Sequence, residues 1–178
     1  MKSFETAVGT ATPRPNHTTP EYPTKAQIAA YGAFAFLYLR SDQHRDVPMH
    51  LARLAIQPAI DLGFFKIFEH EDVPRAAVTW AFLDRDAERR MVAGELLKPQ
   101  DWVSGDVMWV REIIAPYGKG TAAAVVRWLQ RSVPDRVSRV RYLRIDPGHQ
   151  RRRIVEITRH GSGFGARAVP AAHILNDD

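Results

Sequence analysis

Residues 107–115 constrain the fold of this chain most, because they form a nearly continuous apolar run, VMWVREIIA. Such a run is typical of a central strand that is covered on both faces. A loop follows at residues 116–121, with glycine at positions 118 and 120, and a helical pattern then covers residues 122–132. Backbone amides of this loop and the N-terminus of the helix can bind a phosphate. A plain turn is the alternative, since Gly-x-Gly before a helix is common.

The rest of the chain predicts further helices and strands around this central strand. Thr24 can cap a helix that runs to about Arg40, a polar loop follows at 41–46, and a second helix starts near Pro48 and ends at Gly63. Other predicted elements are a strand hairpin at 64–69 and 76–82, a helix at 84–92, and strands at 137–145 and 153–158. This order predicts an α/β (α+β) fold with a mixed, mainly antiparallel sheet flanked by helices.

The composition predicts one folded domain. The chain has 178 residues, of which 45% are hydrophobic, which is enough for a core. We expect a flexible N-terminal arm at 1–22, a domain at 23–165 and an irregular C-terminal tail at 166–178. The absence of cysteine excludes disulfides and thiolate metal ligands.

Charge and hydropathy indicate where the protein is located in the cell and which classes of partner it can bind. The N-terminus has no secretory signal pattern, and the longest apolar run, residues 26–39, is too short to span a bilayer. We therefore expect a cytoplasmic protein without a membrane span. The net charge of +5 favours acidic partners, which include nucleic acid, anionic lipid and acidic proteins.

Two titratable residues stand out as candidates for acid–base chemistry. His44 lies in the polar loop between the first two helices, next to Arg45, and histidine is the usual general base. Glu112 interrupts the apolar strand, and strict alternation puts it on one face with Met108, Val110 and Ile114. A carboxylate in such surroundings is costly unless it is paired, so Glu112 suits a base or a partner that orients histidine. The alternatives are a solvated loop histidine and a structural ion pair.

The remaining polar patches have less specific interpretations. Asp101 is expected to cap a packed turn, and Lys119 either contacts a phosphate or is merely exposed. Arginines at 139, 141, 144 and 151–153 form a basic region that is either a solvated edge or a docking surface. Few aromatic residues interleave them, so the pattern argues against a surface that stacks the bases of nucleic acid. No HExxH, Walker, GxSxG or zinc-knuckle spacing occurs, so we predict no metal site.

Several motifs together resemble the RTX-toxin-activating lysine acyltransferases. They keep the family's order from about residue 35 to 160: SDQHR at 41–45, QPAI at 57–60, VTWA at 78–81, DWVSGD at 101–106, IAPYG at 114–118 and RIDP at 144–147. The DWVSGD block followed by IAPYG is the most specific part.

This resemblance implies an N-acetyltransferase-like fold and an acyl carrier protein that delivers the acyl group as a phosphopantetheine thioester. It implies no tightly bound cofactor, internal lysines of an RTX-type protoxin as acceptors, and a homodimer. His44 falls on the family's catalytic histidine, as a general base or a transient acyl carrier, and Glu112 falls where the family has aspartate.

The predicted donor-binding and substrate-binding residues lie around these two positions: Ser41, Arg45, Trp109, Gly118, Lys119, Gly120 and Thr121. The loop at 118–121 would hold the pantetheine end of the donor. Two competing hypotheses are a coenzyme A-dependent N-acetyltransferase-like enzyme and a non-catalytic module that binds an acidic protein or nucleic acid.

Overall fold

The computed structural model describes residues 23–145, 152–160 and 163–176, and the predicted arm at 1–22 lies outside this part. In chain order the elements are α1 (Lys25–Arg40), α2 (Met49–Leu62), β1 (Phe65–His70), β2 (Val73–Leu83), α3 (Arg85–Ala93), the 3-10 helix η1 (Pro99–Trp102), β3 (Val107–Ile114), α4 (Lys119–Ser132), β4 (Arg139–Ile145), β5 (Arg152–His160), β6 (Gly163–Val169) and α5 (Ala171–Leu175).

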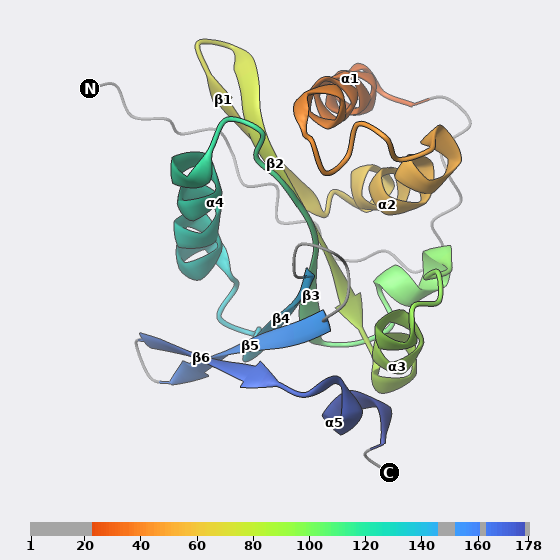
Figure 1. The fold of residues 1–178 in the computed structure, drawn as a ribbon, viewed down its shortest axis with the longest axis vertical. Coiled ribbons are helices and arrows are strands. Elements are labelled where there is room, and N and C mark those ends of the chain that lie inside the picture. Colours follow the sequence, from red (N-terminus) through yellow and green to blue (C-terminus); the bar gives the residue numbers. More distant parts are fainter. Residues whose placement is uncertain (1–22, 146–151, 161–162, 177–178) are drawn as a thin grey trace.

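The strands form one sheet in the order β1-β2-β3-β4-β5-β6. All neighbours are antiparallel except β3 and β4, which are parallel and are connected through α4. Helices α1, α2 and α3 lie on one side of the sheet and α4 lies on the other (Figure 1). The predicted α+β class with a mainly antiparallel, N-acetyltransferase-like sheet is therefore confirmed.

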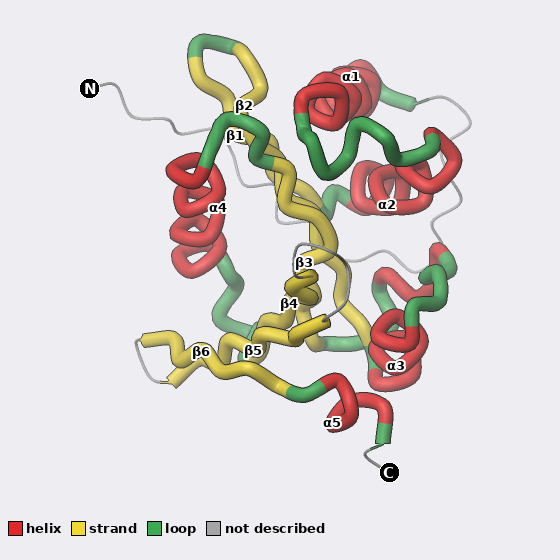
Figure 2. The backbone as a smooth tube through the Cα atoms, in the orientation of Figure 1, coloured by secondary structure: helices red, strands yellow, loops and turns green. Residues whose placement is uncertain are grey.

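Capping residues that can be recognised in the sequence set several helix boundaries. Thr24 forms a capping box with Gln27 at the start of α1. The side chain of Asp84 accepts a hydrogen bond from the backbone N–H of Ala87 in α3. Gly63 and Gly94 end α2 and α3 in the left-handed conformation, at φ of 70° and 96°. The connection at 41–48, which carries His44, lies between the end of α1 and the start of α2 and is drawn as a loop in Figure 2.

A β-bulge in β3 changes which side chains face each helix layer. Thr79 of β2 pairs with Glu112, but the next residue, Trp80, pairs with Val110, so Arg111 is the extra residue. Beyond the bulge the alternation is inverted. Val110 packs in the cluster on the α4 side, whereas Ile114 packs with α1 and α2.

The bulge corrects one prediction from strict alternation. Glu112 does not share a face with Met108 and Val110, which pack towards α4. It shares a face with Ile114 instead, and its partner Thr79 lies between Ala77 and Ala81 on that same face of β2. The extra residue therefore turns the carboxylate towards the α1–α2 connection.

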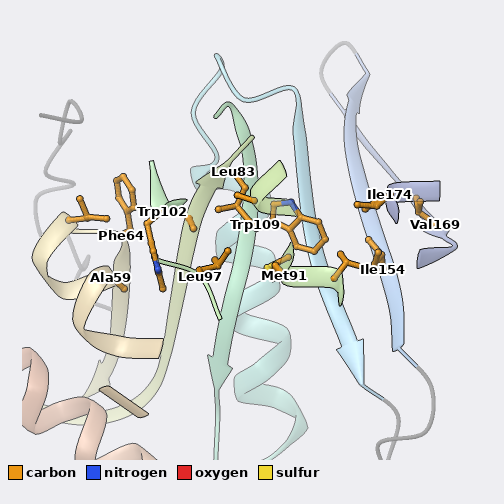
Figure 3. Packing of buried hydrophobic residues seen from close by; sticks show 14 residues of the cluster. Ala59, Phe64, Leu83, Met91, Leu97, Trp102, Trp109, Ile154, Val169 and Ile174 are labelled. Atoms are coloured by element: carbon orange, nitrogen blue, oxygen red, sulfur yellow. The ribbon is translucent and has the colours of Figure 1, made fainter. Parts of the chain in front are cut away.

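The apolar core on the side of the sheet that carries α1, α2 and α3 consists of two clusters. The cluster drawn in Figure 3 joins β2, β3 and β5 to α3 and α5, with Leu83, Trp109 and Ile154 fully buried. A second cluster packs α1 and α2 on the sheet through Phe34, Leu37 and Ala77. The rigid packing of α1 and α2 fixes the loop between them.

Two predicted boundaries are corrected in the C-terminal half. Helix α4 begins at Lys119 rather than 122, so Gly120 and Thr121 lie in its first turn instead of a loop. Residues 166–175 were expected to be irregular, but they continue β6 and form α5. The tail acquires regular structure because β6 pairs with β5 along its whole length, and Ile174 of α5 is buried in the core cluster.

Candidate active site

The imidazole of His44 and the carboxylate of Glu112 meet on the α1–α2 side of the sheet. His44 Nε2 lies 3.2 Å from Glu112 Oε2, although the residues are 68 positions apart in the chain. The His44 side chain is 12% exposed and that of Glu112 is 27% exposed. A partly buried pair of this kind can accept and return a proton while remaining in reach of a substrate.

Ser41 holds the other nitrogen of the imidazole. Its Oγ lies 2.7 Å from His44 Nδ1, and its backbone carbonyl accepts hydrogen bonds from the N–H groups of His44 and Arg45. When His44 is neutral, Nε2–H can donate to Glu112 while Nδ1 accepts from the Ser41 hydroxyl. When His44 is protonated, both N–H groups still have acceptors, so the arrangement accommodates both protonation states.

Tyr38, in the last turn of α1, is a site residue that the sequence analysis did not single out. Its ring centroid lies 4.8 Å from that of His44, and the residue is 7% exposed. Burial, together with the negative charge of Glu112, raises the pKa of Tyr38 well above that of an exposed phenol. Helical spacing offered a signal, because Tyr38 lies one turn before Ser41.

Two further polar side chains flank Glu112 at the bulge. Thr79 lies opposite it on β2, and its buried Oγ1 has no hydrogen-bond partner among residues 23–145, 152–160 and 163–176. The Arg111 guanidinium donates to the sulfur of Met91 and lies 6.0 Å from the Trp102 ring centroid. Burial lowers the pKa of Arg111, and the charge of Glu112 opposes that shift.

Strands β3 and β4 separate next to this pair. Only residues 108–110 of β3 pair with residues 140–142 of β4, although the strands extend to Ile114 and Ile145. On the α4 side of the sheet an apolar cavity of about 90 Å³ lies at this separation, with Val110, Ile113 and Tyr142 in its wall. The cavity does not include His44 or Glu112, which belong to the opposite side of the sheet.

Apart from Trp109, the predicted donor-binding and substrate-binding residues divide into two groups. Ser41 contacts His44, and Arg45 is an exposed neighbour whose Nη1 lies 3.1 Å from Asp42. Gly118 caps α4 at a φ of 104°, a conformation that favours glycine, and leaves open space where a Cβ would stand. Lys119, Gly120 and Thr121 form the first turn of α4, which starts on the side of the sheet away from α1 (Figure 1).

Trp109 lies in the core rather than at a substrate surface. It is completely buried, and its Nε1–H donates to Glu88. Asp101 has the predicted capping role: it is buried and accepts hydrogen bonds from Arg90 and from the Lys98 backbone N–H. Both residues stabilise the scaffold behind the site, and the arrangement gives no support to donor binding by Trp109.

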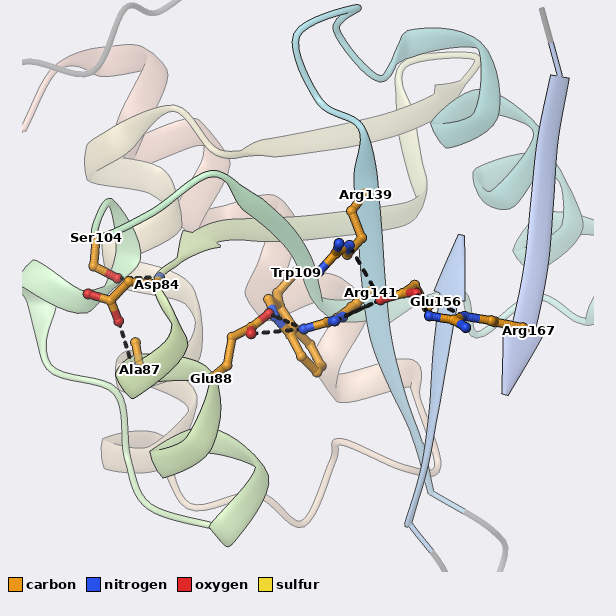
Figure 4. A network of polar contacts seen from close by, with 9 residues as sticks. All are labelled: Asp84, Ala87, Glu88, Ser104, Trp109, Arg139, Arg141, Glu156 and Arg167. Atoms are coloured by element: carbon orange, nitrogen blue, oxygen red, sulfur yellow. Dashed lines mark hydrogen bonds and ion pairs between the residues drawn. The ribbon is translucent and has the colours of Figure 1, made fainter. Parts of the chain in front are cut away.

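Part of the predicted basic region is also structural. Arg141 is buried and binds Glu88 and Glu156, which in turn accepts from Arg167 and pairs with Arg139 (Figure 4). Burial alone would raise the pKa of Glu156, but the hydrogen bonds from Arg167 and Arg141 and the arginine charges outweigh it and lower the pKa. Arg141 is therefore not free for docking. Asp146 and Pro147 of the RIDP motif lie outside the described residues.

Within the described part of the chain, no group of three potential metal-ligating side chains occurs. Across the same residues, no helix combines the length and the apolar character that crossing a bilayer requires.

Comparisons with known proteins agree on one family. The family model described as the RTX toxin acyltransferase family (HlyC) matches residues 24–159. The chain is 38% identical over 147 residues to the protein-lysine palmitoyltransferase CyaC of Bordetella bronchiseptica, covering 82% of this chain and 74% of CyaC. It is 30% identical over 131 residues to the RTX-I toxin-activating lysine-acyltransferase ApxIC of Actinobacillus pleuropneumoniae, covering 73% of each chain. It is also 30% identical over 117 residues to the protein-lysine myristoyltransferase HlyC of Escherichia coli, covering 65% of this chain and 66% of HlyC.

Proposed function

The chain belongs to the RTX toxin acyltransferase family and is an acyltransferase, and on that premise we propose that it moves a fatty acyl group from acyl carrier protein to internal lysines of an RTX-type protoxin. The observation that carries this proposal is the contact between His44 and Glu112, two residues that the family resemblance selects and that lie 3.2 Å apart. The names of the relatives support a palmitoyl or myristoyl group.

The His44–Glu112 pair acts as the acid–base unit. It takes one proton from the lysine ammonium, and His44 carries it as an imidazolium bonded to Glu112 and to Ser41. The neutral amine attacks the thioester carbonyl carbon, the C–N bond forms, and the C–S bond then breaks. The pantetheine thiolate leaves with one of the two lysine protons, and the other passes to water.

The separation of β3 from β4 supports a path for the donor. A thioester that passes between the strands can contact Val110 and Ile113 on one side of the sheet and Glu112 on the other. The apolar cavity on the α4 side suits the fatty chain, whose burial is worth about 0.8 kcal/mol per methylene. The glycine-capped start of α4 suits the pantetheine phosphate because open space lies where a Cβ would stand at Gly118 and at Gly120.

Charge and family support the remaining assignments. A net charge of +5 favours an acidic carrier protein as donor. We assign Arg45 to substrate contact because it is exposed beside His44. A homodimer and a cytoplasmic location complete the proposal.

Co-expression tests the function directly. The chain is expressed with an RTX-type protoxin, and intact-mass and peptide mass spectrometry measure fatty acylation of its lysines. Purified enzyme with palmitoyl–acyl carrier protein or palmitoyl-coenzyme A then identifies the donor. Acylation that depends on the carrier protein supports the proposal. No lysine acylation, or transfer from coenzyme A alone, contradicts it.

A further inference from the structure

The hydroxyl of Tyr38 is a hydrogen-bond donor at the active site for which the described residues provide no acceptor. The ring packs in the α1–α2 cluster and lies 4.8 Å from the His44 ring, so its position is fixed. Within the described residues, the hydroxyl makes no hydrogen bond. It is also not one of the unpaired polar atoms sealed from solvent, which include Thr79 Oγ1.

The other side-chain donors around His44 and Glu112 either contact other protein groups or are inaccessible to a substrate. The Ser41 hydroxyl lies against His44 Nδ1, and the Arg111 guanidinium contacts Met91 and Trp102. Thr79 is 0% exposed, so a substrate cannot reach it without displacing the core. Tyr38 is therefore the side-chain donor next to His44 that remains free for a substrate atom.

The protonation state of Tyr38 decides what it can do. Burial and the charge of Glu112 raise the pKa of Tyr38, so the phenol stays protonated at neutral pH. It cannot act as a base, and it is a poor proton donor to a leaving thiolate, because an ordinary thiol has a pKa of about 8.5. A neutral phenol that keeps its proton can still donate a strong hydrogen bond to an oxyanion.

We propose that Tyr38 is a further catalytic residue, whose hydroxyl donates a hydrogen bond to the thioester carbonyl oxygen when the lysine attacks. This inference rests on the proposed function. The carbonyl oxygen gains negative charge as the C–N bond forms, and Tyr38 stabilises it without transferring its proton. When the C–S bond breaks and the carbonyl reforms, the hydrogen bond weakens again.

The test compares Tyr38→Phe with Tyr31→Phe, which removes the same hydroxyl two turns earlier on α1. Steady-state transfer from palmitoyl–acyl carrier protein to a protoxin fragment gives kcat and KM, and thermal denaturation gives Tm. We expect Tyr38→Phe to lower kcat about 100-fold, with KM unchanged. Its Tm should not fall, because the hydroxyl has no hydrogen-bond partner in the described part of the chain. Tyr31→Phe should match the wild type in kcat.

The outcomes separate the two proposals. Active wild type with a fully active Tyr38→Phe variant rejects the role of Tyr38 alone. A drop in Tm that accompanies the lost activity also rejects it, because the hydroxyl would then be structural. A wild-type enzyme that transfers no acyl group to lysine overturns the proposed function, and the role of Tyr38 falls with it.

Discussion

Nε2 of His44 lies 3.2 Å from Oε2 of Glu112, and this contact joins the α1–α2 connection to the central strand of the sheet. Two features produce it. The packing of α1 and α2 fixes the loop that carries His44, and the bulge at Arg111 turns Glu112 to that side. Without the extra residue, alternation would point the carboxylate towards α4.

Replacement of His44 should remove activity without unfolding the protein. His44→Ala deletes the imidazole that carries the proton, so lysine acylation should fall by at least about 100-fold. His50→Ala, at an exposed position in α2, is the matched control and should retain full activity. Mass spectrometry of the co-expressed protoxin measures both. Normal acylation by His44→Ala would exclude this residue as the base.

Variants at Glu112 should separate charge from reach. Glu112→Gln keeps the length but removes the negative charge, and Glu112→Asp keeps the charge but withdraws the carboxylate by about one methylene. We expect Glu112→Gln to lower kcat because the imidazolium of His44 loses its charged partner. We expect Glu112→Asp to lower kcat because displacing a catalytic group by about 1 Å can reduce the rate roughly 100-fold. Aspartate is the residue that the family resemblance has at this position. A fully active Glu112→Asp enzyme would show that the local backbone adapts to the shorter side chain.

Acyl-chain length should depend on the cavity beside α4. Val126 lines this cavity and is 40% exposed, so a larger side chain there can narrow it without disrupting the core. Val126→Trp should shift the preference from palmitoyl towards shorter chains, whereas Val126→Ala should not. Competition between acyl carrier proteins loaded with different chains measures this preference. An unchanged ratio in Val126→Trp would place the fatty chain elsewhere.

Acid should destabilise the protein partly through Glu156. Its pKa is lowered from 4.5 in the folded state, so its contribution to stability is complete above pH 4.5 and is lost as the pH falls below that value. Glu156→Gln should lower the free energy of unfolding by about 3 kcal/mol at pH 7, because the buried Arg141 loses a charged partner. The difference in free energy of unfolding between wild type and variant should shrink from pH 5 to pH 3.

Urea unfolding at pH 7, 5, 4 and 3 measures this gap. Glu95→Gln, which changes an exposed carboxylate, is the control and should follow the wild type at each pH. A gap that stays constant down to pH 3 would mean that the Glu156 carboxylate does not titrate differently in the folded and unfolded chains.

The sequence predicted the helix caps and the central strand because these depend on local chemistry, as at Thr24, Gly63 and Gly94. His44 and Glu112 were selected by the resemblance of their motifs to the family, and the structure places their side chains in contact. The bulge at Arg111 was not predictable, since it depends on how β2 pairs with β3. For the same reason the burial of Trp109 against Glu88 was not predictable: Glu88 lies on another element, and no spacing along the chain connects the two residues.

The central claim is that His44 and Glu112 work as one unit in lysine acylation. A double-mutant cycle measures this directly, with single-turnover rates of acyl transfer for wild type, His44→Ala, Glu112→Gln and the double variant. If the residues share one proton-transfer step, the double variant should be about as slow as the slower single variant. Rate losses that multiply would show that the two residues act independently, and would contradict the account.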